Sequence, residues 1–243
     1  MFLFNWNGYI GNWKFFGKKM KNNLKKILIV APHPDDETLG CGGTILKHKS
    51  LGDEVHWLIC TKMFENSTYK LNQIKIREKE ISSVYKHYKF DSLLNLSYEA
   101  ASLNQTMIKN IVEKLNKILI NLKPDVIYLP FFGDAHSDHR ILTEAVLASS
   151  KTFRAPFIKK ILAYETLSET NFSIPNSIFK PNVYIDISRF FNTKLEILEL
   201  YKSEIKNHPF PRSKKAVEAL ALLRGSESDL HYAEAFMLIK SIE

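Results

Sequence analysis

Histidines and carboxylates that could bind a metal ion occur in two clusters along this chain. Residues 31–37 (APHPDDE) place one imidazole and three carboxylates within five positions, and residues 134–139 (DAHSDH) place two of each within six. Zinc binds histidine nitrogen and carboxylate oxygen, and a catalytic zinc usually has three protein ligands and a water. Together the clusters therefore indicate a metal site with an acid and a base beside it, as metal-assisted hydrolysis requires.

Each cluster follows an apolar run, residues 27–30 and residues 126–132. Such runs are typical of strands covered on both faces. We expect strands at residues 26–31, 55–61, 92–96, 125–132, 158–165 and 183–187, and helices at residues 42–50, 74–88, 107–122, 139–150, 190–205, 214–223 and 232–241. The small residues of segment 40–43 (GCGG) suit a tight turn before the first helix.

Alternating strands and helices predict an α/β fold, a Rossmann-like doubly wound, mostly parallel sheet with helices on both faces. The ligand site of such a sheet lies beyond the carboxyl ends of its strands. Both clusters fall at such ends, so we expect them to meet in space. A single large domain fits the 243 residues. We assign residues 20–243 to it and residues 1–19 to an N-terminal extension of uncertain role.

The chain carries a formal net charge of +8 with its lysines scattered along it. A lysine-rich surface is favoured over a nucleic-acid partner, because no nucleic-acid-binding motif is present. Stable membrane insertion is not expected, since no run approaches the roughly 18–20 apolar residues of a spanning helix. The two cysteines, Cys41 and Cys60, imply no disulfide framework. With no signal-peptide pattern in residues 1–19, a cytoplasmic location is expected.

The two clusters resemble the motifs of the LmbE-like/PIG-L superfamily of zinc-dependent N-deacetylases. The resemblance extends to Arg77-Glu78-Lys79-Glu80, at the place of the family's Arg-X-X-Glu helix, and to residues 232–236 (YAEAF), which are similar to the closing segment of many bacterial members. It spans roughly residue 24 to the C-terminus. It implies an enzyme that removes the acetyl group from an amino sugar.

The resemblance also implies a role for each residue that matches the motifs. His33, Asp36 and His139 match the metal ligands, and Asp35 matches the general base. His136 matches a histidine that acts as an acid or as an electrostatic stabiliser, and we expect Asp138 to orient it. The proton for the leaving amine would come from Asp35 or from His136, and the sequence leaves both open.

Four nearby residues carry weaker predictions. Arg77 either binds substrate oxygens or is an exposed helix charge. Glu37 is expected to buttress the loop, Asp134 to hydrogen-bond a ligand histidine, and Glu234 to be a helix-surface carboxylate.

The expected reaction is release of acetate and a free amine from an acetamido sugar or from its nucleotide-, lipid- or glycoside-linked conjugate. The expected cofactor is Zn²⁺, with Fe²⁺ as an alternative that the same ligands accept. The partner is then a small-molecule N-acetylated sugar, while the oligomeric state is left open. Two alternatives stand beside this prediction: a non-catalytic sugar- or metal-binding protein on the same fold, and a deacylase of a non-sugar N-acyl compound.

Overall fold

A central sheet organises the computed structural model, which describes residues 24–66 and 69–243. Within these residues the sheet has seven strands in the order β3-β2-β1-β4-β5-β7-β6. The strands are β1 (Lys26–Ala31), β2 (Glu54–Lys62), β3 (Ser92–Glu99), β4 (Val126–Pro130), β5 (Lys160–Tyr164), β6 (Val183–Asp186) and β7 (Ala233–Ser241). β1 to β5 are parallel, and β7 is antiparallel to both of its neighbours. The predicted mostly parallel α/β sheet is confirmed.

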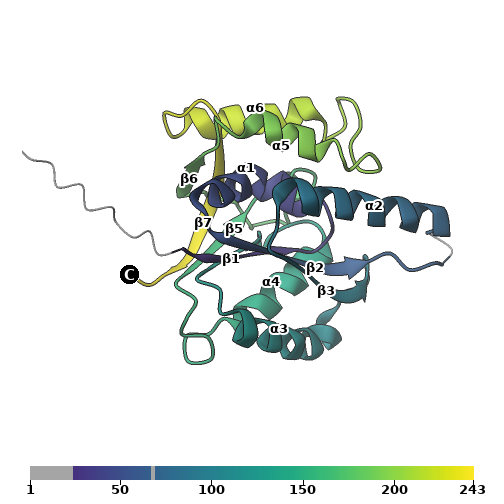
Figure 1. Ribbon diagram of the computed structural model, residues 1–243, viewed down its shortest axis with the longest axis vertical. Helices are drawn as coiled ribbons and strands as arrows, with labels where there is room; N and C mark the ends of the chain where they lie inside the picture. The colour runs from purple at the N-terminus through teal and green to yellow at the C-terminus, as the bar shows by residue number, and fades with distance from the viewer. Residues whose placement is uncertain (1–23, 67–68) are drawn as a thin grey trace, which may run out of the picture.

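Helices cover both faces of the sheet (Figure 1). α3 and α4 lie on one face, α1 and α2 lie on the other, and α5 and α6 lie beyond α1. The helices are α1 (Asp36–Leu51), α2 (Leu71–Tyr88), α3 (Ile108–Leu122), α4 (Ser137–Ser149), α5 (Phe191–Leu198) and α6 (Lys214–Ser226). The near-continuous apolar sequence of β1 follows from this arrangement, because its residues pack alternately into the two cores.

The helix predicted from residue 232 to residue 241 is wrong, because this segment forms the strand β7. Its apolar stretch is short, and periodicity alone does not separate a short buried strand from a helix segment. Tertiary pairing decides, because β7 bridges β5 and β6. The helix predicted from residue 190 to residue 205 is also too long, since α5 ends at Leu198.

The predicted tight turn at residues 40–43 is wrong as well, because α1 already begins at Asp36 and runs through these residues. Their small size serves close packing. A Cβ atom on Gly40 would lie 2.2 Å from Cδ2 of Tyr164, and one on Gly43 would lie 2.5 Å from Cγ2 of Ile187. The glycines therefore let α1 approach β5 and the residue that follows β6.

The carboxyl ends of β1 and β4 lie side by side, because these two strands pair in the sheet. Each leads directly into one of the two clusters and then into a helix, α1 or α4. The sheet thus brings together residues far apart in sequence. Within the described residues, no helix is long and apolar enough to cross a bilayer. The predicted N-terminal extension lies outside the described part of the chain.

Candidate metal centre and active site

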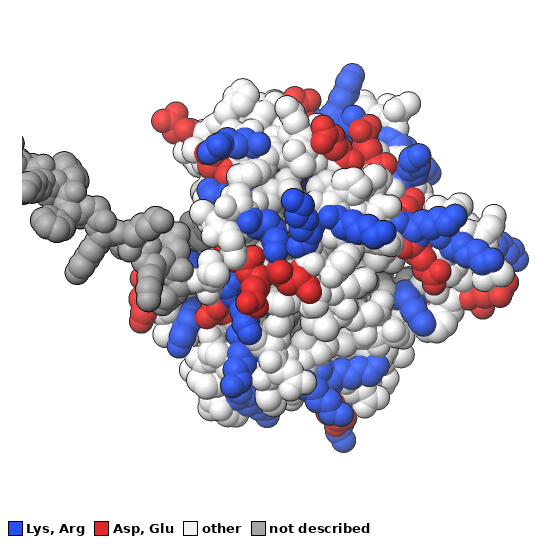
Figure 2. Space-filling model, in the orientation of Figure 1, with Lys and Arg blue, Asp and Glu red and all other residues white. Residues whose placement is uncertain are grey.

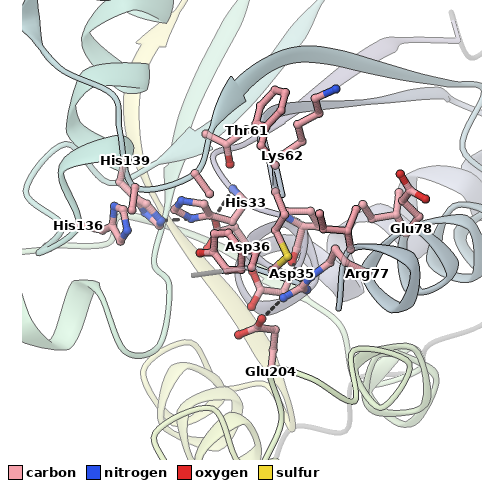
Figure 3. A pocket seen from close by; sticks show the side chains of 18 of the residues that line it. His33, Asp35, Asp36, Thr61, Lys62, Arg77, Glu78, His136, His139 and Glu204 are labelled. Carbon is pink, nitrogen blue, oxygen red and sulfur yellow. Dashed lines mark hydrogen bonds and ion pairs between the residues drawn. The ribbon is translucent and has the colours of Figure 1, made fainter. Parts of the chain in front are cut away.

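The turn between β1 and α1 presents His33, Asp35 and Asp36 to a pocket at the sheet edge (Figure 3). Asp36 is the first residue of α1, where the helix dipole favours a negative charge. One of its carboxylate oxygens, Oδ2, accepts the backbone N–H of His33 at 2.9 Å. Asp35, the residue before the helix, has φ of 135° and ψ of −29°. A non-glycine residue held at positive φ stores strain, and such strain concentrates at functional sites.

Two histidine rings approach the same carboxylate oxygen of Asp36. His33 Nδ1 and His139 Nε2 each lie 3.3 Å from Asp36 Oδ2. Each of these three residues offers one possible ligand atom, and the three atoms lie within 4.8 Å of one another. The three residues can therefore hold a metal ion. The sheet thus brings together the three residues that the sequence predicted as metal ligands.

The far side of each ring faces a further carboxylate. His139 Nδ1 lies 2.8 Å from Asp134 Oδ2, and the other oxygen of Asp134 accepts the Thr170 hydroxyl at 2.6 Å. His33 Nε2 lies 3.0 Å from Asp138 Oδ2. Metal-binding histidines usually donate their second ring N–H to such a partner, which fixes the tautomer and leaves the other nitrogen free for the metal.

One observation tests whether these residues fit a metal. His139 is 1% exposed, yet its Nε2 makes no hydrogen bond of acceptable geometry to any described residue. Buried polar atoms are nearly always satisfied, so an orphaned ring nitrogen that points at a carboxylate suits a cation between them. The charges agree: burial alone would lower the pKa of His139, but Asp36 and Asp134 together raise it to about 10. The site stabilises positive charge.

Asp35 lies beside this group with its side chain almost fully buried. Burial and then the negative charge of Asp36 raise its pKa to about 7, while the charges of Arg212 and Arg77 act against this rise. Arg212 Nη1 donates to Asp35 Oδ2 at 2.8 Å. A carboxyl with a pKa near neutrality is suited to accept and return a proton.

His136 is the N-terminal cap of α4, and its Nδ1 accepts the backbone N–H of Asp138 at 3.1 Å. Burial and then the charge of His33 lower the pKa of His136 to about 4. The ring is therefore neutral near pH 7, with its proton on Nε2. Asp138 thus contacts His136 through its backbone N–H, while its side chain has other partners. The Asp138 carboxylate contacts His33 and accepts the backbone N–H groups of Ala101 and Leu103 at 2.8 and 3.0 Å.

Arg77 lines the pocket but is not the exposed helix charge that the sequence allowed, because it is only 7% exposed. Its Nη1 donates to the backbone carbonyl of Pro34 at 3.0 Å, and its Nη2 pairs with Glu204. These contacts bind the β1–α1 turn rather than leaving the guanidinium free for a substrate. Arg77 is thus placed to support Asp35.

Glu37 buttresses the same turn, as expected. Its Oε1 accepts the Tyr201 hydroxyl at 2.7 Å, and its Oε2 accepts the backbone N–H of Asp35 at 3.0 Å. Glu234, expected on a helix surface, is instead buried in β7. It pairs with Lys194 at 2.7 Å and accepts the amide N–H groups of Gly43 and Thr44.

Sequence reasoning missed the residues that reach the site from the segment after α5. Arg212 contacts Asp35 across 177 residues of chain, and Glu204 and Tyr201 come from the same segment. No motif marks them, and an arginine that directly follows Pro211 reads as a loop residue. Only the packing of this segment over the β1–α1 turn reveals them.

The pocket has a volume of about 430 Å³. Histidines and carboxylates form one end (Figure 3), and side chains of β2, of the segment that follows it and of α2 form the other. The apolar and aromatic members of that second wall are Met63, Phe64, Tyr69, Ile74 and Ile81. The space therefore combines a polar reactive end with a wall suited to the face of a ring.

Residues 28–150, about half of the chain and including both clusters, match the family described as PIG-L: GlcNAc-PI de-N-acetylase. The chain belongs to the PIG-L family. This PIG-L protein is 27% identical over 234 residues to a diacetylchitobiose deacetylase of Thermococcus kodakarensis, with 91% of this chain and 85% of the relative covered.

Solved structures show the same fold. The N,N'-diacetylchitobiose deacetylase of Pyrococcus horikoshii superposes with a TM-score of 0.74 at 22% identity, over 90% of this chain and 85% of that one. The 4-carboxy-2-hydroxymuconate hydratase GalB of Pseudomonas putida superposes with a TM-score of 0.69 at 14% identity, over 90% and 98%. Because two different named activities share the fold, the reaction has to be argued from the site.

Proposed function

We propose that this PIG-L protein is a metal-dependent hydrolase that removes the acetyl group from an acetamido sugar or its conjugate, giving a free amine and acetate. One observation carries the proposal: His33 and His139 share Asp36 Oδ2 on one side and are each backed by a carboxylate on the other. Asp35 lies beside them in a pocket large enough for a sugar derivative. The name of the Thermococcus relative agrees with this reaction.

His33, Asp36 and His139 would hold the metal. We propose Zn²⁺, with Fe²⁺ as the alternative, because two imidazoles and one carboxylate accept both. When bound, such an ion lowers the pKa of a coordinated water and polarises the carbonyl of the amide.

Asp35 would act as the general base that takes a proton from the attacking water. Its raised pKa matches the task, because a base is most effective when its pKa lies near the working pH. Having taken the proton, Asp35 would return it to the nitrogen as the carbon–nitrogen bond breaks.

His136 would stabilise the oxyanion that forms on the amide carbonyl. With Nδ1 accepting the Asp138 amide, the neutral ring carries its proton on Nε2 and can donate it in a hydrogen bond. A neutral imidazole is a poor acid for the leaving amine, which favours Asp35 as the proton donor. We therefore propose Asp35 as this donor, where the sequence left Asp35 and His136 open.

The substrate would be a small N-acetylated sugar or conjugate rather than a nucleic acid. Over the face shown in Figure 2, lysine and arginine side chains are interspersed with acidic ones. Nucleic-acid recognition usually needs a concentrated basic surface. The positive net charge is compatible with an anionic conjugate, such as a nucleotide- or phospholipid-linked sugar.

The test is amine and acetate release from a panel of N-acetylated sugars and conjugates, with metal-analysed protein in the presence and absence of a chelator. Chelator-sensitive release of both products from one member supports the proposal. Binding of a panel member at saturating metal without release would instead favour a non-catalytic sugar-binding protein. Release from non-sugar N-acyl compounds alone would favour the deacylase alternative.

A further inference from the structure

The segment between α5 and α6 contributes Arg212 to the pocket, where this residue joins two carboxylates. Arg212 Nη1 donates to Asp35 Oδ2 at 2.8 Å, and its Nη2 lies 3.1 Å from Glu204 Oε2. The guanidinium is planar and its donors have fixed directions, so two carboxylates bound to one fork are fixed relative to each other. The orientation of the Asp35 carboxylate therefore depends on Arg212.

These contacts close into a ring. The second oxygen of Glu204 pairs with Arg77 Nη2, and Arg77 Nη1 donates to the backbone carbonyl of Pro34 at 3.0 Å. The chain of contacts thus starts at the side chain of Asp35 and ends at the peptide that precedes Asp35. The same ring holds the carboxylate and the strained backbone that carries it.

The carboxylate held in this way has one oxygen occupied. Oδ2 accepts from Arg212, whereas Oδ1 makes no hydrogen bond to another described residue. A carboxylate free to rotate about its χ angles would present either oxygen at varying distances from a water. A carboxylate that is held through Oδ2 presents Oδ1 in one direction. This matters because a general base must lie within hydrogen-bond reach of the proton that it accepts.

We propose that Arg212 is a positioning residue that orients the general base Asp35, with Glu204 and Arg77 holding Arg212 in place. The inference rests on the proposed hydrolase function and deepens it. Arg212 also borders the pocket, so the rival role is direct binding of a substrate. The two roles differ in kinetics: misorienting a base lowers kcat, whereas losing a substrate contact raises KM.

The experiment compares Arg212→Met and Arg212→Lys with the wild-type metal-loaded protein. The matched control is Arg224→Met, because Arg224 forms a comparable ion pair with Glu165 outside this pocket. For Arg212→Met we expect kcat to fall about 100-fold with KM and metal content unchanged, since small misplacements of reacting groups cost about this much. Arg212→Lys keeps the positive charge but not the two fixed donors of the guanidinium, and its kcat should lie between those of wild type and Arg212→Met.

Free guanidinium supplies a further readout. At millimolar concentrations, far below those that unfold proteins, it should partly restore kcat of Arg212→Met and leave wild type and Arg224→Met unchanged. Unaltered kcat in Arg212→Met, or a loss confined to KM, would overturn the proposal. If Arg212→Met does not fold, the folded Arg212→Lys decides by the same criterion.

Crystal structures separate this inference from the hydrolase proposal, because they need no activity. In Arg212→Met, or in Arg212→Lys if the former does not fold, the Asp35 carboxylate should leave its single orientation. An unmoved Asp35 carboxylate would refute the positioning role. Absence of amine release by the wild type, with Asp35 displaced in the variant, would instead count against the hydrolase function alone.

Discussion

His139 and Asp134 form a buried pair in which Nδ1 of the imidazole lies 2.8 Å from a carboxylate oxygen, while Nε2 of the same ring faces Asp36. The ring is thus held by one carboxylate and aimed at another. Because Asp134 in turn accepts the Thr170 hydroxyl, the orientation of the histidine is fixed from behind. This pair determines which nitrogen is available to a metal.

Replacing Asp134 by Asn should weaken metal binding without removing any of the three proposed ligands. Loss of such a supporting carboxylate typically costs 10–100-fold in metal affinity or activity, and we expect about that decrease in affinity for Zn²⁺. Competition with a chromogenic chelator measures it. The control is Asp229→Asn, a conservative change at an exposed position. Equal affinities in the two variants would contradict the supporting role of Asp134.

Asp35→Asn should abolish most of the turnover and leave the metal in place. An amide cannot take a proton from water, and loss of a general base lowers rates by about 10²–10⁴-fold. Amine release and metal analysis on the same sample check both statements. Glu78→Gln is the matched control, because Glu78 lines the pocket at a distance from the histidines (Figure 3) and should keep near-normal kcat. Full activity of Asp35→Asn would exclude Asp35 as the base.

Lys194→Met should strongly destabilise the fold, because it leaves the Glu234 carboxylate buried without its cation. The two side chains are 4% and 5% exposed and lie 2.7 Å apart. Breaking a buried pair costs about 3–5 kcal/mol, whereas the exposed pair of Lys214 and Glu199 should contribute about 0–1 kcal/mol. Urea unfolding of Lys194→Met and of the control Lys214→Met measures the difference. Similar free energies of unfolding would contradict the prediction.

Gly40→Ala should destabilise the protein although alanine favours helices. The added Cβ would lie 2.2 Å from the ring of Tyr164, whose hydroxyl is fixed by a 2.8 Å hydrogen bond to the carbonyl of Val30. Overpacking of this kind costs about 1–3 kcal/mol. Thermal unfolding tests it against Ser50→Ala, an exposed position of the same helix, where a change within about 0.5 kcal/mol is expected. Unchanged stability of Gly40→Ala would show that α1 can shift away from Tyr164.

Local sequence is sufficient for the parallel part of the fold. The apolar runs of β1 and β4 could be predicted as buried strands because both of their faces are covered, and the residues that follow them had to lie at one edge of the sheet. The type of β7 could not be predicted in this way. Its short apolar stretch fits either a helix or a strand, and only pairing with β5 and β6 selects the strand.

The sequence by itself determined the two compact clusters of possible metal ligands, and the resemblance of these clusters to the PIG-L motifs singled out His33, Asp36 and His139. Only the tertiary structure decided which carboxylate contacts which histidine. The Asp138 carboxylate contacts the distant His33, whereas the nearby His136 contacts the backbone N–H of Asp138. The tertiary structure also decided that Arg212 contacts Asp35. Contacts between side chains depend on how the sheet and its loops pack, and the spacing of two residues along the sequence does not give their distance in the fold.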